Sequence, residues 1–424
     1  MSADVAIVGA GAAGLAAAIF TRRLNRQVRV VLLDGARRPG AKILVSGGGR
    51  CNVTNVRVTE QDFAGGSRDG VRQVLRALPV SATVAFFREL GVPLHEEEHG
   101  KLFPDSNRAR DVLDALLQEG DRLGVERLDD HRVLAVSRQH QEFALETNRR
   151  TLSAGRLVLA TGGQSIPKSG SDGAGWNFAK DLGHTIVPPV PALVPLLLDS
   201  ASPLSHAELS GVSHDVEITA WLAGRVATRV TGSLLWTHFG ISGPAALDVS
   251  RHWTRAAAEK LDIRLTLNVC PGCTFDSLDG RLVDLIGSRP RASLQTLLAS
   301  LIPSAVASAL LKAVGIEEGQ ISGALTRGHR RTLTHALVEW TLPVVGTRGY
   351  NYAEVTAGGV NFAEINPRTM ESRRCPGLFL VGEILDVDGR LGGFNFQWAW
   401  SSAMVSARAL AHSPAPRAQG RFSG

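Results

Sequence analysis

The sequence predicts an α/β fold in which a Rossmann-like dinucleotide-binding domain is interrupted by an insert. Three observations carry this prediction. Residues 4–34 combine apolar runs, a glycine-rich turn and an alanine-rich stretch in the order strand, turn, helix, strand. Residues 187–195 hold four prolines and mark a change in composition. A buried strand with glycine-rich turns then returns at 377–393, as in a domain that the chain leaves and rejoins.

The first predicted strand leads into the pattern G-x-G-x-x-G at Gly9, Gly11 and Gly14. Gly9 permits the tight turn, Gly11 lets backbone approach a pyrophosphate, and Gly14 lets helix and strand pack closely. The start of the following helix offers free N–H groups and a partial positive charge to phosphates. The second strand ends in Asp34, which is placed to accept hydrogen bonds from a ribose. These parts together predict a dinucleotide site.

The composition is that of an ordinary globular chain, with 44% hydrophobic and 20% charged residues over 424 positions. The net charge is +6, but no run of basic residues is longer than a pair. We therefore expect a small-molecule substrate and no specific nucleic-acid partner. No apolar run is long enough to span a bilayer, and the four cysteines make no disulfide framework. We expect a cytoplasmic protein without a membrane partner, and the sequence gives no sign of its oligomeric state.

A second glycine-rich segment, residues 39–52, follows the second strand. Three consecutive glycines at 47–49 exclude an ordinary helix or strand interior. They predict a backbone that lies flat against a planar ring or a phosphate, with Ser46, Arg50 and Cys51 presented beside it. The apolar residues 43–45 argue against a flexible surface loop.

Glycines close three of the predicted strands, at residues 9–14, at 160–163 and at Gly382. A nicotinamide cofactor needs little beyond the first strand–turn–helix unit, whereas FAD stretches across a sheet and is held by segments far apart in the sequence. The spread over residues 9–397 therefore favours FAD. No second complete dinucleotide fold is visible, so we expect NAD(P)H only as a transient electron donor.

The chain also contains the stretches GAKILVSGGGRCNVTN, GKLFPDS, LLWTHFGISGPAALDVS, VTAGGVNFAEINPRTMES and PGLFLVGEILDVDGRLGGFNFQWAWSSA. These resemble the signatures of a bacterial flavoprotein family that includes aminoacetone oxidase and the flavoprotein of the bile-acid-inducible group. The resemblance covers nearly all of the chain. It implies an FAD-binding domain of glutathione-reductase type, interrupted by an insert with a β part and a helical part.

The implied FAD-binding domain covers residues 1–190 and 352–412, and the insert covers 191–351. Within the insert, the β part spans about 191–269 and 335–351, and the helical part about 270–334. Residues 413–424 lack apolar periodicity and are expected to form a disordered tail.

The resemblance also implies the residues that contact the cofactor. For the ADP half and the sheet edge these are Gly9, Gly11, Ala13, Gly14, Asp34, Val133, Thr161 and Gly162. For the pyrophosphate and ribityl chain they are Gly382 and Glu383. Beside the isoalloxazine they are Lys42, Ser46, Gly48, Arg50 and Cys51, and at its pyrimidine end Asn395, Phe396 and Gln397.

Arg50 and His238 are the candidate catalytic residues. His238 would act as an acid or base from the insert, and an equal alternative makes it a loop histidine that orients a turn before Gly243. Arg50 could stabilise a Cys51 thiolate, although close packing against the flavin explains Cys51 better.

Cys270 and Cys273 form a C-x-x-C pair. A zinc site would need two further ligands, so no metal site is predicted and a structural turn is favoured over a redox pair. The run of glutamates at 96–98 is interpreted as a solvated loop, and residues 169–175 as a turn that caps a helix.

These features predict an FAD-dependent oxidoreductase acting on a small molecule. The flavin would be reduced by NAD(P)H or by an amine or alcohol, and reoxidised by oxygen or an organic acceptor. The alternatives are a flavoprotein of tRNA modification, suggested by a pI near 9.5, and a flavin-binding protein without catalysis.

Overall fold

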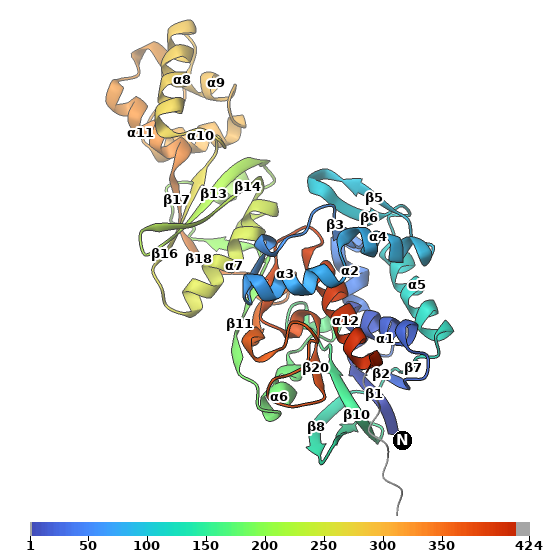
Figure 1. Cartoon of the computed structure of the whole chain (residues 1–424). Coiled ribbons are helices and arrows are strands. Elements are labelled where there is room, and N and C mark those ends of the chain that lie inside the picture. The colour runs from blue at the N-terminus through green and yellow to red at the C-terminus, as the bar shows by residue number, and fades with distance from the viewer. Residues whose placement is uncertain (1, 413–424) are drawn as a thin grey trace, which may run out of the picture. The chain divides into compact units, whose positions relative to one another are not determined.

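The computed structural model describes residues 2–412, so the predicted tail at 413–424 lies outside the described residues. The chain divides into two units, unit 1 with residues up to 189 and from 354 onward, and unit 2 with residues 190–353 (Figure 1). Each unit has an apolar core of its own.

Unit 1 is built on a parallel sheet with the order β7-β2-β1-β10, to which β20 is added beside β10. All four residues of β2 are buried, as the continuous apolar run predicts for a parallel strand covered on both faces. The strands are β1 (Ser2–Val8), β2 (Val30–Leu33), β7 (Glu126–Leu128), β10 (Thr151–Leu159) and β20 (Leu378–Leu380).

Strand β10 changes partner along its length. Its first half pairs antiparallel with β9 (Glu142–Thr147), which pairs in turn with β8 (Val133–Gln139). Its second half, from Leu157 to Leu159, pairs parallel with β20. This exchange brings a strand from the C-terminal part of the chain beside strands from the N-terminal part.

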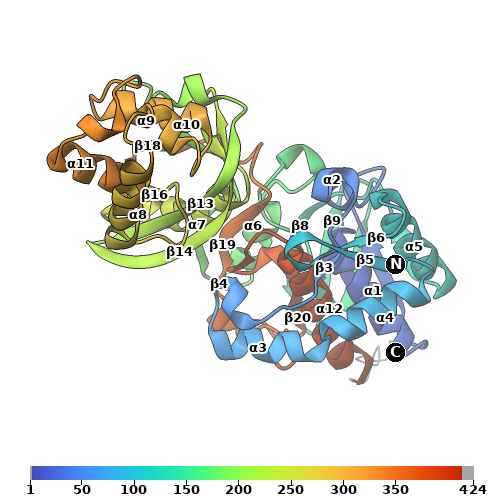
Figure 2. The same ribbon diagram turned by 90° about the horizontal axis from the view of Figure 1, so that it is seen from above.

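Helices cover this sheet. Helix α12 packs along α1 and α3, and Figure 2 shows the three side by side. The buried residues of α1 include four alanines and a glycine, whose small size lets neighbouring backbones approach closely. The helices of unit 1 are α1 (Ala12–Leu24), α2 (Ala41–Gly49), α3 (Arg68–Ala77), α4 (Val80–Glu89), α5 (Ala109–Arg122), α6 (Ala174–Asp181) and α12 (Phe394–His412). The predicted α/β fold of Rossmann type is confirmed.

Three small sheets complete unit 1 and its connection to unit 2. They are β3 (Thr54–Asn55) with β6 (Lys101–Pro104) and β5 (Leu94–Glu97), β4 (Phe63–Gly65) with β21 (Val387–Gly389), and β11 (Ile186–Ala192) with β19 (Val355–Val360).

Unit 2 combines a mainly antiparallel sheet with a group of helices. The sheet order is β17-β16-β13-β14-β15-β12-β18, and α7 packs on it. Its strands are β12 (Leu196–Leu198), β13 (Ser213–Leu222), β14 (Arg225–Thr237), β15 (Gly240–Ser242), β16 (Ile263–Asn268), β17 (Trp340–Leu342) and β18 (Val344–Thr347). The helices are α7 (Pro244–Ala258), α8 (Phe275–Ser288), α9 (Leu294–Leu298), α10 (Ser304–Ala313) and α11 (Arg327–Val338), the last four gathered beyond one end of the sheet in Figure 1.

Within residues 2–412, no helix combines the length and the apolar character needed to cross a bilayer.

Candidate functional site

The turn after β1 is closed by two glycines that leave no room for a side chain. Gly9 has a φ of +103°, and a Cβ there would lie 2.5 Å from the Ala160 carbonyl oxygen. A Cβ on Gly14 would lie 1.8 Å from the Gly9 carbonyl oxygen. These glycines bring the ends of β1 and β10 and the start of α1 into direct backbone contact, as the motif predicts.

Gly11 differs from its two neighbours in the motif, because no atom lies within 4 Å of the position of an added Cβ. It is the N-cap of α1, makes no side-chain cap, and is followed by a first turn without an acidic residue. Gly11 thus has no side chain that could cap the first N–H groups of α1, and the position of its missing Cβ is open. This fits a pyrophosphate at the helix N-terminus.

Asp34 ties this turn to the end of β2. Its two oxygens accept hydrogen bonds from the N–H groups of Ala10, at 2.7 Å, and Ala36, at 2.8 Å. Burial raises the pKa of Asp34 above its ordinary value, while the hydrogen bonds from Ala36 and Ala10 act in the opposite direction. Each carboxylate oxygen keeps a second lone pair, so the arrangement leaves capacity for a ribose hydroxyl.

The third glycine strand end, Gly382, lies against the first turn of α1. Its φ is +74°, and an added Cβ would lie 2.7 Å from the Cβ of Ala13. Its N–H donates to Ser402 Oγ at 3.0 Å, and its carbonyl accepts from Trp398 Nε1 at 3.1 Å. Gly382 is thus held between α1 and α12, and the structure brings together the ends of β1, β10 and β20.

Thr161 and Gly162 follow β10 at the same edge of the sheet. Gly162 has a φ of +73° and lies near Ser171. The hydroxyl of Thr161 is buried without a hydrogen-bond partner among the described residues. It lies against the start of α6, where a Cβ added to Gly175 would come within 1.9 Å of Thr161 Oγ1, so the hydroxyl is covered by protein.

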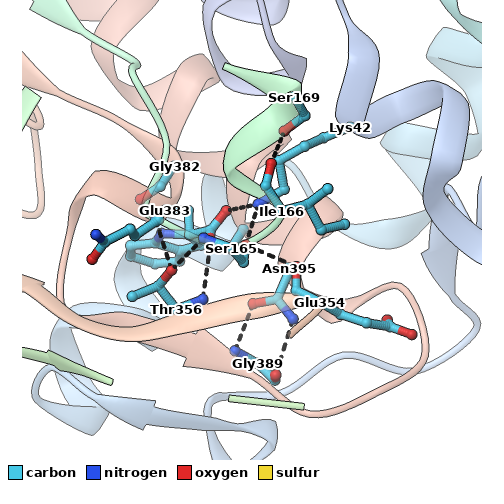
Figure 3. A network of polar contacts seen from close by, with 12 residues as sticks. Lys42, Ser165, Ile166, Ser169, Glu354, Thr356, Gly382, Glu383, Gly389 and Asn395 are labelled. Carbon is cyan, nitrogen blue, oxygen red and sulfur yellow. Dashed lines mark hydrogen bonds and ion pairs between the residues drawn. The ribbon is translucent and has the colours of Figure 1, made fainter. Parts of the chain in front are cut away.

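Glu383 is the centre of a polar network that joins four distant segments (Figure 3). Its Oε2 lies 2.5 Å from Lys42 Nζ on α2. Its Oε1 accepts from the Thr356 N–H at 2.8 Å and from Ser165 Oγ at 3.1 Å. Lys42 also donates to Ser165 Oγ at 2.7 Å.

The same network fixes the loop after β10. Thr356 Oγ1 accepts the N–H groups of Gln164, at 2.8 Å, and Ser165, at 3.0 Å. Gly163 must be glycine, because an added Cβ would lie 2.6 Å from Thr356 Oγ1 and 2.9 Å from Glu383 Oε1. The sequence prediction included Lys42 and Glu383 but missed Ser165 and Thr356. Their only signals were the nearby Gly162–Gly163 pair and the VTAGGV stretch.

The triple-glycine segment is not a regular helix, although it forms the end of α2. Ser46 has a ψ of 147°, and Gly47 and Gly48 have φ values of 56° and 68°. Ser46 Oγ donates to the Ile43 carbonyl at 2.8 Å, and an added Cβ on Gly48 would meet no atom within 4 Å. The Cβ position at Gly48 is therefore open, and a ring or phosphate lying against this backbone stays a prediction.

Cys51 is completely buried, with 0% of its surface exposed. Burial raises the pKa of its thiol to about 12, and a hydrogen bond with Ser46 only partly offsets this. The suggestion that Arg50 stabilises a Cys51 thiolate is corrected by this placement, because a buried neutral thiol is inert. Cys51 belongs to the apolar core of unit 1.

Arg50 turns toward the β5–β6 hairpin. Its Nη1 lies 2.6 Å from Glu97 Oε1, and its guanidinium lies over the ring of Phe103 at 4.1 Å from the centroid. Glu97 also contacts His95 Nε2 at 3.4 Å. The interpretation of residues 96–98 as a solvated loop is therefore wrong for Glu97, which belongs to β5 and holds Arg50 in place.

The three predicted residues at the start of α12 have different surroundings. The Asn395 amide makes reciprocal hydrogen bonds with the Gly389 backbone, at 2.8 and 2.9 Å. Phe396 stacks on Trp400 with ring centroids 5.6 Å apart. Gln397 is buried, accepts from Thr54 Oγ1 at 2.7 Å, and donates to the Leu78 carbonyl at 2.7 Å. The side-chain amides of Asn395 and Gln397 are thus hydrogen-bonded within the protein. That these residues and Phe396 line the pyrimidine end of the ring stays a prediction.

The remaining predicted features are Val133, His238 and residues 169–175. Val133 begins β8. The preceding Arg132 packs against the turn after β2, where a Cβ added to Gly35 would lie 3.2 Å from the Arg132 Cβ. His238 belongs to unit 2, where it is exposed and packs edge-on against Phe239. Residues 170–173 form the turn before α6, which begins at Ala174 with Gly173 as its N-cap.

No group of three or more His, Cys, Asp or Glu side chains in residues 2–412 is arranged to hold a metal ion.

Comparison with known proteins gives consistent matches over nearly the whole chain. A family model described as the HI0933-like protein Rossmann domain matches residues 3–409. A Clostridium scindens protein named 3-dehydro-bile acid delta(4,6)-reductase is 32% identical over 410 residues, which cover 97% of this chain and 99% of the relative. An Escherichia coli protein named ribosomal RNA dihydrouridine synthase is 34% identical over 407 residues, which cover 96% of this chain and 98% of the relative.

A Haemophilus influenzae protein of the same name is 35% identical over 408 residues, covering 95% of this chain and 97% of the relative. Among solved structures, a quinol–fumarate reductase with menaquinol molecules superposes with a TM-score of 0.53 at 16% identity. The match covers 99% of this chain and 72% of that one, and at this identity it shows a shared fold.

Proposed function

From the premise that this chain belongs to the HI0933-like Rossmann family, we propose that it reduces a carbon–carbon double bond conjugated to a carbonyl group. The chain is an FAD-dependent oxidoreductase. The observation that carries the cofactor assignment is the meeting of three glycine strand ends beside the uncapped start of α1. These segments lie far apart in the sequence, as the extended shape of FAD requires.

The reaction class rests on the names of the relatives. One is named for reducing the Δ4,6 bonds of a 3-dehydro bile acid, and two are named for making dihydrouridine. In both cases the chemistry is addition of hydrogen across a carbon–carbon double bond conjugated to a carbonyl. Bound FAD supplies hydride transfer for such a reduction, and NAD(P)H is the proposed electron donor.

The residues of the chain then have separate tasks. The first N–H groups of α1 bind the pyrophosphate, and Asp34 accepts from the ribose. The Lys42–Glu383 pair, with Ser165 and Thr356, holds the segments that frame the cofactor. Such a network fixes the geometry of the site before the substrate binds.

Arg50 is the residue proposed to act on the substrate. Glu97 and Phe103 fix its guanidinium, but a guanidinium has five N–H donors and Glu97 occupies only part of them. The free donors would bind the substrate carbonyl and stabilise the negative charge that develops on its oxygen during reduction of the double bond.

The conjugated double bond could belong to a small 3-oxo ring compound or to a uracil in RNA. One observation favours RNA. In unit 2, Arg348 lies 3.5 Å from the ring centroid of Tyr352 and 4.6 Å from that of Phe239, and Tyr352 is 50% exposed. Aromatic and guanidinium planes of this kind stack with unpaired bases. The dispersed arginines favour the small molecule, because they predict weak and salt-sensitive RNA binding.

The test is reoxidation of the protein after anaerobic reduction with NADPH. One arm supplies a 3-oxo-Δ4 steroid, a second supplies ribosomal RNA that lacks dihydrouridine, and a third supplies oxygen. Reoxidation by the first or second acceptor, with the saturated product identified by mass spectrometry, is expected. Reoxidation by oxygen alone would reject the reductase and indicate an oxidase, while leaving the FAD assignment intact.

A further inference from the structure

The turn between β16 and α8 places two thiols beside one cavity in unit 2. Cys270, Pro271, Gly272 and Cys273 form a tight turn in which the Cys273 N–H donates to the Cys270 carbonyl at 3.0 Å. Gly272 has a φ of +82°, the value that the third residue of a type II turn requires. Proline at the second position favours the same turn.

Neighbouring residues hold this turn rigidly. The side chain of Asn268 accepts from the Cys270 N–H at 2.9 Å and donates to the Cys273 carbonyl at 3.0 Å. Helix α8 begins directly afterwards, and its N-cap Thr274 forms a capping box with Ser277. The Asn268 side chain thus joins the first and last residues of the turn, and the capping box fixes the chain that follows it.

The geometry suits a bond between the two sulfur atoms. The first and last Cα atoms of a β-turn lie within about 7 Å of each other. Disulfides join Cα atoms about 4.4–6.8 Å apart. Both cysteines are free thiols. Both also line a cavity of about 280 Å³, whose wall includes His214, Asp215 and Arg281.

The two thiols are not equivalent. Cys270 is 8% exposed, whereas Cys273 is only partly buried. Burial raises the pKa of Cys270 to about 11, with the neighbouring Cys273 adding to the rise and Arg281 opposing it. Cys273 is therefore the more accessible of the two thiols, and Cys270 is the more buried one.

A metal-binding role has less support than a redox role. A structural zinc ion takes four ligands. The residues described here offer no group of three or more His, Cys, Asp or Glu arranged for a metal, at this turn or elsewhere. A zinc site at this turn therefore lacks ligands, whereas thiol–disulfide exchange requires only the two neighbouring thiols.

We propose that Cys270 and Cys273 form a reversible redox site that reacts with low-molecular-weight disulfides such as glutathione disulfide. The Cys273 thiolate attacks the small disulfide, forming a mixed disulfide and releasing one thiol. Cys270 then loses its proton and attacks the Cys273 sulfur, which releases the second thiol. Two cysteine thiols are oxidised to one disulfide, and the small disulfide takes up the two electrons and two protons as two thiols.

The experiment counts thiols in the intact flavin-loaded protein after exposure to glutathione disulfide. The protein is quenched in acid, denatured, alkylated and weighed by mass spectrometry. Wild type is expected to lose two of its four alkylatable thiols and to regain them with dithiothreitol. Cys375→Ser, a matched change at a buried cysteine outside the turn, is expected to lose two as well.

The single variants test the order of attack. Cys270→Ser is expected to accumulate a stable glutathione adduct on Cys273, and Cys273→Ser to react much more slowly. The double variant Cys270→Ser/Cys273→Ser is expected to keep its flavin and turnover close to wild type. Two results would overturn the proposal. One is a wild-type protein that keeps four free thiols after exposure to glutathione disulfide, and the other is a loss of two thiols in the double variant as well.

Discussion

Lys42 Nζ lies 2.5 Å from Glu383 Oε2, although 341 positions separate the two residues in the sequence. The pair joins α2, from the N-terminal part of unit 1, to the segment that follows β20, from its C-terminal part. Both side chains are only partly exposed, at 25% and 18%. The contact therefore fastens together the two chain segments that are proposed to frame the cofactor.

Lys42→Met is expected to weaken FAD binding and to destabilise unit 1 by about 1–3 kcal/mol, because it leaves the Glu383 carboxylate without its cation. The double variant Lys42→Met/Glu383→Gln should cost less than the sum of the two single changes, since the pair is coupled. Flavin dissociation and urea unfolding measure both effects. The solvent-exposed pair Arg108–Asp111 is the matched control, and its removal should leave the stability close to that of the wild type. Strict additivity at Lys42 and Glu383 would contradict the coupling.

Gly11→Val should reduce flavin binding, whereas Gly14→Ala should reduce the stability of the fold. The backbone of Gly11 has an ordinary φ of −82° and faces open space, so valine there should block the pyrophosphate but leave the flavin-free fold intact. Alanine at Gly14 would place its Cβ 1.8 Å from the Gly9 carbonyl oxygen, so it should destabilise the flavin-free protein itself. Flavin content and the unfolding midpoint of the flavin-free protein separate the two effects. Full flavin content in Gly11→Val would show that the pyrophosphate lies elsewhere.

Arg50→Ala is expected to keep FAD and to slow the reaction or raise KM. Glu97→Gln should have a smaller effect in the same direction, because it loosens the guanidinium without removing it. The exposed Arg57→Ala is the control for a change of charge alone. Stopped-flow reduction and steady-state kinetics provide the measurement. Kinetics identical to wild type with every active donor and acceptor would remove Arg50 from the site.

The stability of the protein should fall as the pH is lowered through the range below about 6.5, and His184 should account for part of the loss. His184 is buried between Glu364, at 2.9 Å, and Ser372, at 2.8 Å. Burial lowers its pKa below the ordinary 6.5, against the opposing effect of Glu364. The unfolded chain therefore binds the proton more readily, and the stabilisation is present above pH 6.5 and lost as the pH falls towards the lower folded value.

The measurement is the urea midpoint between pH 5 and 8 in wild type and His184→Gln. Glutamine keeps hydrogen-bonding groups but does not titrate, so the slope in this range should become shallower. Some slope should remain, because His206 and His214 have pKa values that burial also lowers. An unchanged slope would exclude His184 as a contributor.

The sequence was sufficient to predict the elements that depend on local pattern. Apolar runs closed by glycine identified β1, β10 and β20, because burial on both faces of a parallel sheet leaves a short continuous apolar signal. The roles of Gly9 and Gly14 could also be predicted from the sequence, because the motif specifies which positions leave no room for a Cβ.

The partners of the polar side chains could not be predicted in the same way. The network around Glu383 needs Ser165 and Thr356, which lie 218 and 27 positions away in the sequence and meet it only in the folded chain. Arg50 was expected to face a ring, but its contact with Glu97 depends on how the β5–β6 hairpin folds back. Gln397 is a further case, because only the fold shows that its amide is used by Thr54 and Leu78.

Extraction of the flavin from the purified protein is the most direct test of the FAD assignment. The protein is denatured without proteolysis, and the released chromophore is identified by chromatography and mass spectrometry and counted against protein. We expect FAD, released without covalent attachment, at about one molecule per chain after reconstitution. FMN in the extract, or a colourless protein that takes up no flavin when FAD is supplied, would contradict it.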